Sequence, residues 1–105
     1  MAQNPAAELI TEPGGACALR GAVTFDTVQK LWRESARLLA VAGKGKDLTL
    51  DLSGVVGVDS AGLALLVDWK GQAQAIGSHL RFAAVPPRLL AIARISDAES
   101  LLLEA

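Results

Sequence analysis

The chain has 105 residues, a mass of 10.9 kDa, a hydrophobic content of 51% and a formal net charge of -1. This length predicts a single domain over residues 1–105, with residues 1–6 as a flexible terminus, and the balanced charge disfavours a nucleic-acid-binding surface. Because Cys17 is the single cysteine, an internal disulfide is excluded. The sequence shows no secretion signal, and its apolar runs are much shorter than the roughly 20 residues that span a bilayer. We therefore predict a cytoplasmic protein.

The N-terminal segment predicts a β-hairpin. Residues 8–11 and 17–23 are expected to form its two strands, and the second segment alternates in side-chain type. Pro13-Gly14-Gly15 lies between them and is a strong turn signal. The two strands should therefore pair in antiparallel orientation.

A helix is expected next. It should be capped at Thr24 or Asp26 and end at Gly43, because apolar residues recur at helical spacing between these points. The repeating apolar positions include Leu31 and Trp32. A tryptophan in such a pattern is more often a core or interface residue than a cofactor contact.

The middle of the chain predicts a strand, a turn and a long helix. Residues 47–52 alternate with leucines on one face, and Ser53-Gly54 predicts a turn. Asp59 can cap a helix over residues 60–76. That helix is apolar around more than half of its circumference, so some of its large side chains should lie at the edge of the core or outside it.

The remaining segments complete an α/β fold. Residues 79–85 predict a fourth strand, Pro86-Pro87 opens a helix whose core face includes Ile95, and a short last turn runs through Leu103. Strands joined through a helix should be parallel neighbours. We therefore expect a mixed four-stranded sheet, made of the N-terminal hairpin plus parallel strands, with helices packed mainly on one face.

Reactive side chains are few and scattered. His79 lies on a predicted strand, where a surface position is favoured over a role as general base, and Cys17 is favoured as a small buried hydrophobe over a nucleophile. The residues 43–46 lack the spacing of a phosphate-binding loop, and one His with one Cys does not make the usual zinc site. The carboxylates that could gather a cation are Asp47, Asp51, Asp59 and Asp68. We expect no enzyme activity, no catalytic residue, no metal site and no cofactor; an enzyme that uses His79 or these carboxylates is the less favoured alternative.

The most informative sequence is Asp59-Ser60-Ala61-Gly62, where the long helix is expected to begin. Asp and Ser are favoured helix caps, so a purely structural role is one interpretation. The other is a recognition hydroxyl at Ser60, since a helix start presents free backbone N–H groups and a partial positive charge. A phosphate on Ser60 would face the helix dipole favourably but would repel Asp59.

Four segments together resemble the STAS domain family, which is typified by bacterial anti-sigma factor antagonists. They occur in the family order and span nearly the whole chain: Leu19-Arg20-Gly21, Leu48–Val55, Val58–Leu63 and Leu80–Ile95. The resemblance implies a mixed sheet with helices on one side and no catalysis by the domain itself. Its D-[ST]-x-G-L signature matches Asp59, Ser60, Gly62 and Leu63.

Two interpretations compete within the family. The run from Leu63 to Val67, with Trp69 and Trp32, looks more like the MlaB-type members, whose loop carries Thr at the position of Ser60. This implies an adaptor on the cytoplasmic ATPase subunit of a phospholipid-transporting ABC system, at the inner face of the inner membrane. The alternative is an anti-sigma factor antagonist whose Ser60 is phosphorylated by an anti-sigma kinase.

Both interpretations imply a protein partner with a nucleotide-binding fold, no nucleic acid and only indirect contact with a membrane. The partner-binding residues expected from the resemblance and the apolar helix are Asp59, Ser60, Ala61, Gly62, Leu63, Val67 and Lys70. Surplus apolar surface would also suit a homodimer.

Overall fold

The computed structural model describes residues 7–12, 16–42 and 45–103. Its elements in chain order are β1 Glu8–Thr11, β2 Ala16–Val23, α1 Val28–Arg33, α2 Ser35–Ala42, β3 Asp47–Val58, α3 Ser60–Ala75, β4 His79–Ala83, α4 Pro87–Ile95 and α5 Glu99–Leu103. The flexible terminus expected at residues 1–6, the turn at Pro13-Gly14-Gly15 and the helix end at Gly43 lie outside these ranges. Among the helices described, none has the length and apolar character needed to cross a membrane.

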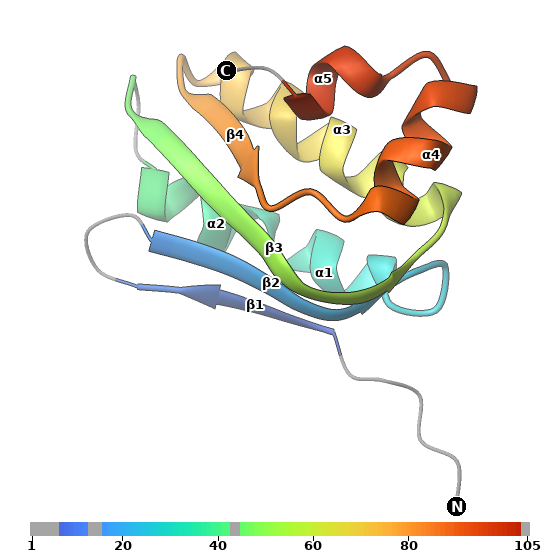
Figure 1. Cartoon of the computed structure of the whole chain (residues 1–105). Helices are drawn as coiled ribbons and strands as arrows, with labels where there is room; N and C mark the ends of the chain where they lie inside the picture. Colours follow the sequence, from blue (N-terminus) through green and yellow to red (C-terminus); the bar gives the residue numbers. More distant parts are fainter. Residues whose placement is uncertain (1–6, 13–15, 43–44, 104–105) are drawn as a thin grey trace, which may run out of the picture.

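The four strands form one mixed sheet in the order β1-β2-β3-β4, which confirms the predicted fold class. β1 is antiparallel to β2, whereas β3 is parallel to both β2 and β4. Figure 1 shows α1, α2 and α3 on one side of the sheet, with α4 and α5 beyond β4. The opposite side of β1, β2 and β3 is free of helices in the described part of the chain.

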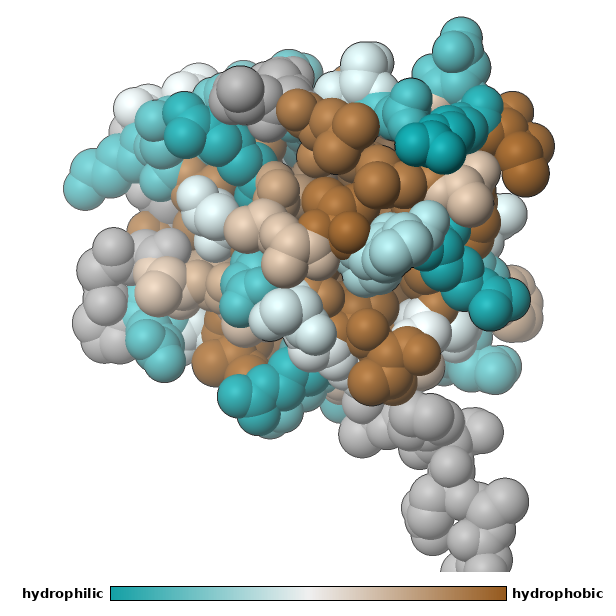
Figure 2. All heavy atoms as spheres, viewed as in Figure 1, coloured by the Kyte–Doolittle hydropathy of each residue, from teal (hydrophilic) through white to brown (hydrophobic). Residues whose placement is uncertain are grey.

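The core lies between the sheet and α3. Leu48, Leu50 and Leu52 alternate along β3 and are completely or almost completely buried, as strand geometry requires for residues on one face. Leu66 and Trp69 of α3 cover them from the other side and are equally buried. Figure 2 shows the molecule from the strand side, where hydrophobic surface is interrupted by polar residues.

The single helix predicted after the hairpin is in fact two helices, because the helical conformation is interrupted at Glu34. The backbone of Glu34 has φ −91° and ψ 6°, and its carbonyl oxygen accepts the N–H groups that begin α2. Ser35 follows the break, and its buried hydroxyl accepts a hydrogen bond from Trp69 Nε1 at 2.7 Å. A partner 34 positions away in sequence thus fixes the break, so helical periodicity alone could not reveal it.

The turn predicted at Ser53-Gly54 is wrong, because β3 continues through it to Val58. The second half of β3 still pairs in parallel with β2, and the register between the two strands shifts at two points, Ala18/Arg20 and Gly21/Ala22. Gly54 lies against the side chain of Arg20, where an added Cβ would come within 2.8 Å of Arg20 Cγ. β4, by contrast, ends at Ala83, two residues earlier than predicted.

The expectation that some large apolar side chains of α3 lie at the edge of the core holds for Val67, which is half-buried, whereas the others on this helix are buried. The expected burial of Ile95 is wrong. Ile95, expected on the core face of α4, is 89% exposed.

Lysine and arginine side chains from the helices donate hydrogen bonds to backbone carbonyls at the outer edges of the sheet. Lys30 Nζ and Arg37 donate to backbone carbonyls of β1 and the residue before it, at Ala7 and Leu9. On the other edge, Lys70 is 3% exposed, and its Nζ donates to the Leu80 carbonyl at 3.0 Å. These bonds occupy backbone acceptors that would otherwise be open to strand pairing with another chain.

The first turn of α3 passes very close to the end of β2. A Cβ built on Gly62 would lie 2.1 Å from the backbone oxygen of Val23 and 2.9 Å from a methyl group of Val58. No side chain fits at that distance, so the approach requires glycine. Gly71, on the same helix, has nothing within 4 Å of the corresponding position.

We expect Gly62→Ala to lower the free energy of unfolding by about 1–3 kcal/mol or more, because β2 and α3 must move apart. Gly71→Ala is the matched control and should raise it by up to about 1 kcal/mol, because alanine favours the helix. Urea denaturation of both variants measures the difference. A Gly62→Ala variant as stable as the wild type would contradict the close packing described for this corner.

Candidate functional site

Asp59 connects the start of α3 to the loop that follows β2. Its Oδ1 accepts the backbone N–H of Gly62 at 3.1 Å, which makes it the N-cap of α3. Its Oδ2 accepts the backbone N–H of Phe25 at 3.0 Å, 34 positions away in sequence. One carboxylate therefore fixes both the helix start and the neighbouring loop.

The surroundings of Asp59 favour its charged form. Partial burial by itself would raise the pKa of this carboxyl, but the backbone N–H groups of Phe25, Gly62 and Ala61 outweigh it and lower the pKa below the ordinary value. The group is therefore ionised at neutral pH. Its negative charge lies at the positive end of the helix dipole, which is a favourable position.

Ser60 is exposed at the first position of α3, as the recognition hypothesis requires. Ala61 is half-buried, whereas Gly62 and Leu63 are buried. Residues four apart lie on the same face of a helix, so Ser60 shares its face with Ala64 and Asp68, which are also exposed. These three residues form an exposed stripe along α3 that carries a hydroxyl, a methyl and a carboxylate in turn.

An apolar groove lies between this stripe and α1. Its volume is about 270 Å³, and it is lined by Val28, Gln29, Trp32, Ala64, Leu65 and Asp68. Trp32, which lines the groove, is 56% exposed, and Phe25, in the loop before α1 whose backbone binds Asp59, is 79% exposed. We call the surface formed by Phe25, Trp32, Ser60, Ala64 and Asp68 the α1–α3 face.

The structure changes the set of residues that can contact a partner. Ser60 offers its side chain to solvent, and Asp59, Ala61 and Val67 are partly accessible. Gly62, Leu63 and Lys70 are buried, which corrects their expected place on the surface. The Lys70 ammonium bonds to the Leu80 carbonyl and lies 5.7 Å from the Phe82 ring centre, so it faces the interior.

Sequence reasoning missed the exposed positions of Phe25 and Trp32. Trp32 was expected on the apolar face of its helix together with Leu31, but neighbouring residues on a helix point about 100° apart. Leu31 is fully buried, and Trp32 turns outward. The adjacency of two large apolar residues was a usable signal that one of them would be exposed.

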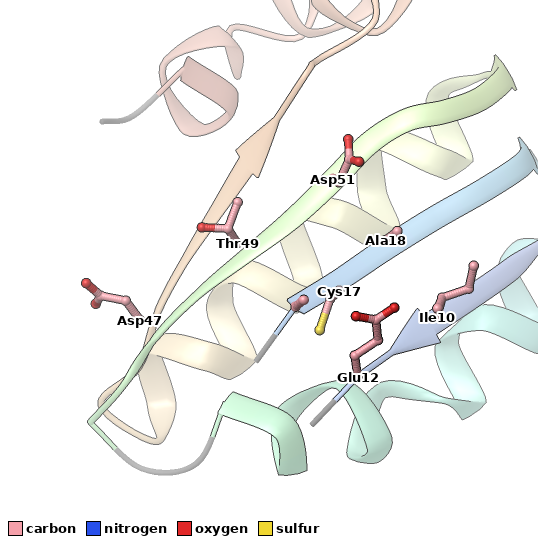
Figure 3. A pocket seen from close by; sticks show the side chains of 8 residues that line it. Ile10, Glu12, Cys17, Ala18, Asp47, Thr49 and Asp51 are labelled. Carbon is pink, nitrogen blue, oxygen red and sulfur yellow. The ribbon is translucent and has the colours of Figure 1, made fainter. Parts of the chain in front are cut away.

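A larger hollow, about 490 Å³, lies on the helix-free side of the sheet (Figure 3). It is lined by Ile10, Glu12, Ala16, Cys17, Ala18, Asp47, Thr49 and Asp51. Asp47 pairs with Arg81 at 3.6 Å, and the Asp51 carboxylate accepts hydrogen bonds from Ser53, which lower its pKa. Burial raises the pKa of the Cys17 thiol, with Arg37 opposing the shift, so the thiolate nucleophile is disfavoured.

The hollow does not assemble a reactive group. Asp47 and Asp51 lie on β3 and Glu12 follows β1, and His79 is not among the lining residues. Over residues 7–12, 16–42 and 45–103, no group of three or more His, Cys, Asp or Glu side chains is placed to hold a metal ion. The α1–α3 face is therefore the stronger candidate site, and it offers an apolar groove, an exposed hydroxyl and a carboxylate.

Comparison with known proteins identifies the architecture. A family model described as "Mlab, STAS domain" matches residues 10–104. Among solved structures, the murine Solute Carrier 26 family member A9 anion transporter in the inward-facing state matches with a TM-score of 0.55 and 14% sequence identity. The match covers 93% of this chain but only 18% of the transporter chain, so it supports the fold alone. A search of curated proteins found no match.

Acid should weaken the contacts of Asp59. Because the folded state lowers its pKa, this carboxylate contributes fully above the ordinary aspartate value of about 3.9, and the contribution is lost as the pH falls through the lower folded-state pKa. We expect Asp59→Asn to cost about 1 kcal/mol at neutral pH, since the amide can still cap Gly62 but cannot replace both carboxylate oxygens. The cost should shrink as the pH falls below about 4.

Urea denaturation at several pH values measures this dependence. Asp26→Asn, an exposed change one residue after Phe25, is the control and should alter stability by less than about 0.5 kcal/mol. If the cost of Asp59→Asn stayed constant down to pH values where carboxylates are protonated, the charge of Asp59 would not be what holds this corner.

Proposed function

The chain belongs to the MlaB-type STAS domain family, and we propose that it is a non-enzymatic adaptor that docks through the α1–α3 face on the cytoplasmic ATPase subunit of a phospholipid-transporting ABC system. STAS domains in general have regulatory or adaptor roles and mediate protein–protein interactions. The adaptor would act in the cytoplasm and reach the inner face of the inner membrane only through this partner.

The exposed aromatic residues beside the groove carry the proposal. Phe25 and Trp32 place two large apolar side chains in solvent, which is unfavourable unless another surface covers them. Aromatic residues of this kind dominate the binding energy of many protein interfaces. The groove of about 270 Å³ is smaller than the roughly 300–1,000 Å³ of typical small-molecule sites, so it suits side chains of a protein partner.

A helical partner segment fits the groove best. Apolar side chains one turn apart on such a segment can enter a groove between two helices, as in other helix-in-groove complexes. Asp68 closes one side of the groove, and the exposed Ser60 lies two turns of α3 before it. Contacts to the Ser60 hydroxyl would then fix the register of the partner on the face.

A second candidate function is an anti-sigma factor antagonist switched by phosphorylation of Ser60. The observation that favours it is the exposure of Ser60 at the start of a 16-residue helix. A phosphate there would add about −1.5 to −2 charges beside Asp59 and next to the apolar groove. A partner seated on the groove would be repelled, which is the behaviour of a switch.

The partner is the first test. We expect affinity capture from the source cell, with the tagged full chain, to recover an ABC ATPase subunit. Trp32→Ala should reduce the recovery at least tenfold, because truncation of a central interface tryptophan typically costs 2 kcal/mol or more. Ile95→Ala removes a large apolar side chain of α4 that is even more exposed, at 89% against 56% for Trp32, and should leave the recovery unchanged.

Recovery of a sigma-regulating kinase without an ATPase would reject the transporter proposal and support the second candidate. Recovery of the chain alone as a dimer that Trp32→Ala dissociates would instead assign the face to self-association.

Substitutions at Ser60 separate the two functions. If phosphorylation controls binding, Ser60→Asp should weaken capture of the partner while Ser60→Ala preserves it, because only aspartate adds a charge. If Ser60 is a recognition hydroxyl on a constitutive adaptor, both substitutions should weaken capture. Equal binding by wild type and both variants would exclude Ser60 from the interface.

A further inference from the structure

Trp32 is exposed, yet both its side chain and its backbone are held by other residues. The indole Nε1–H donates to Asp68 Oδ2 at 3.1 Å. The backbone carbonyl of Trp32 accepts the Ser35 hydroxyl at 2.5 Å. The residue is therefore fixed in orientation while 56% of its surface stays open.

Asp68, which holds the indole, is itself fixed. Gln72, one turn further along α3, donates from Nε2 to the same Oδ2 at 2.6 Å. The helix that carries both residues is secured in the core by Leu66 and Trp69. The acceptor for the Trp32 indole thus stands on a rigid element.

Ser35 connects the Trp32 backbone to a buried tryptophan of the core by hydrogen bonds. Its hydroxyl donates to Trp32 and accepts from the Nε1–H of Trp69, and both Ser35 and Trp69 are buried. The two tryptophans, one at the surface and one inside, are therefore linked through a single hydroxyl. Displacement of the Trp32 backbone would disturb the hydrogen bond from Ser35, whose hydroxyl also accepts the buried bond from Trp69.

The helix that carries Trp32 cannot hold it alone. α1 has only six residues, and helices shorter than about 12 residues are marginal without tertiary contacts. We propose that Asp68 is a positioning residue that fixes the Trp32 indole beside the α1–α3 groove before the partner arrives. This inference rests on the proposed function, because it concerns the same docking face.

The value of such positioning is a smaller entropic cost of binding. A mobile side chain must be immobilised when an interface forms, which weakens affinity by about two- to tenfold for each rotamer-rich residue. The hydrogen bond to Asp68 already restricts this freedom of the Trp32 side chain in the free chain. The groove that Trp32 lines is likewise kept in a defined shape.

Fluorine NMR of the free chain tests the positioning directly. In protein labelled with 5-fluorotryptophan, Trp32→Phe assigns the two resonances. Asp68→Ala should shift and narrow the Trp32 resonance toward that of the free amino acid, while the Trp69 resonance stays in place. Asp68→Asn retains an acceptor oxygen and should restore the wild-type spectrum, and Gln72→Ala, the control, should leave the Trp32–Asp68 bond intact. An unchanged Trp32 resonance in Asp68→Ala would overturn the proposal.

Binding separates positioning from direct contact. With the partner recovered by capture, Asp68→Ala should bind about two- to tenfold more weakly, and Asp68→Asn within twofold of wild type. Equal weakening in both variants would mean that the charge of Asp68 contacts the partner, which overturns the positioning role. Failure to recover any partner would count against the proposed function, and the fluorine spectra of the free chain would still decide the role of Asp68.

Discussion

The structure depends on the close contact between the first turn of α3 and the end of β2. Gly62 permits the approach because a side chain there would collide with the Val23 backbone. Asp59 holds it, since one carboxylate caps the helix and binds the backbone of Phe25. This contact fixes the start of α3 beside the loop that leads into α1, and the bonds Trp32–Asp68 and Trp69–Ser35 continue the attachment along α3.

The proposed docking surface, the α1–α3 face, depends on the same constraint. Once α3 is placed, Ala64 and Asp68 line the groove opposite α1, Trp32 is bound to Asp68, and Ser60 is exposed at the start of the same helix. The surface carries no set of acid, base and nucleophile in the described part of the chain, but it offers apolar area, a hydroxyl and a carboxylate. These are features of recognition, in agreement with the membership of the chain in the MlaB-type STAS domain family.

Local signals in the sequence predicted much of this. The cap at Asp59, the following helix and the alternating leucines of β3 depend on neighbours in sequence, so the fold class, the sheet and the exposed Ser60 could be predicted. The break at Glu34 depends on the bond between Ser35 and Trp69, and the burial of Lys70 depends on an acceptor on β4. Such contacts between distant segments decide which side of a helix faces solvent, and for this reason Lys70 was misplaced and Phe25 and Trp32 were missed.

Hydrogen exchange on the complex with the captured partner shows which backbone segments the partner covers, and so whether it docks on the α1–α3 face. We expect slower exchange at residues 25–33 and 60–68, with residues 8–12 and 47–53 unchanged relative to the free chain. Slower exchange confined to the helix-free side of the sheet, with the α1–α3 face unaffected, would contradict this docking.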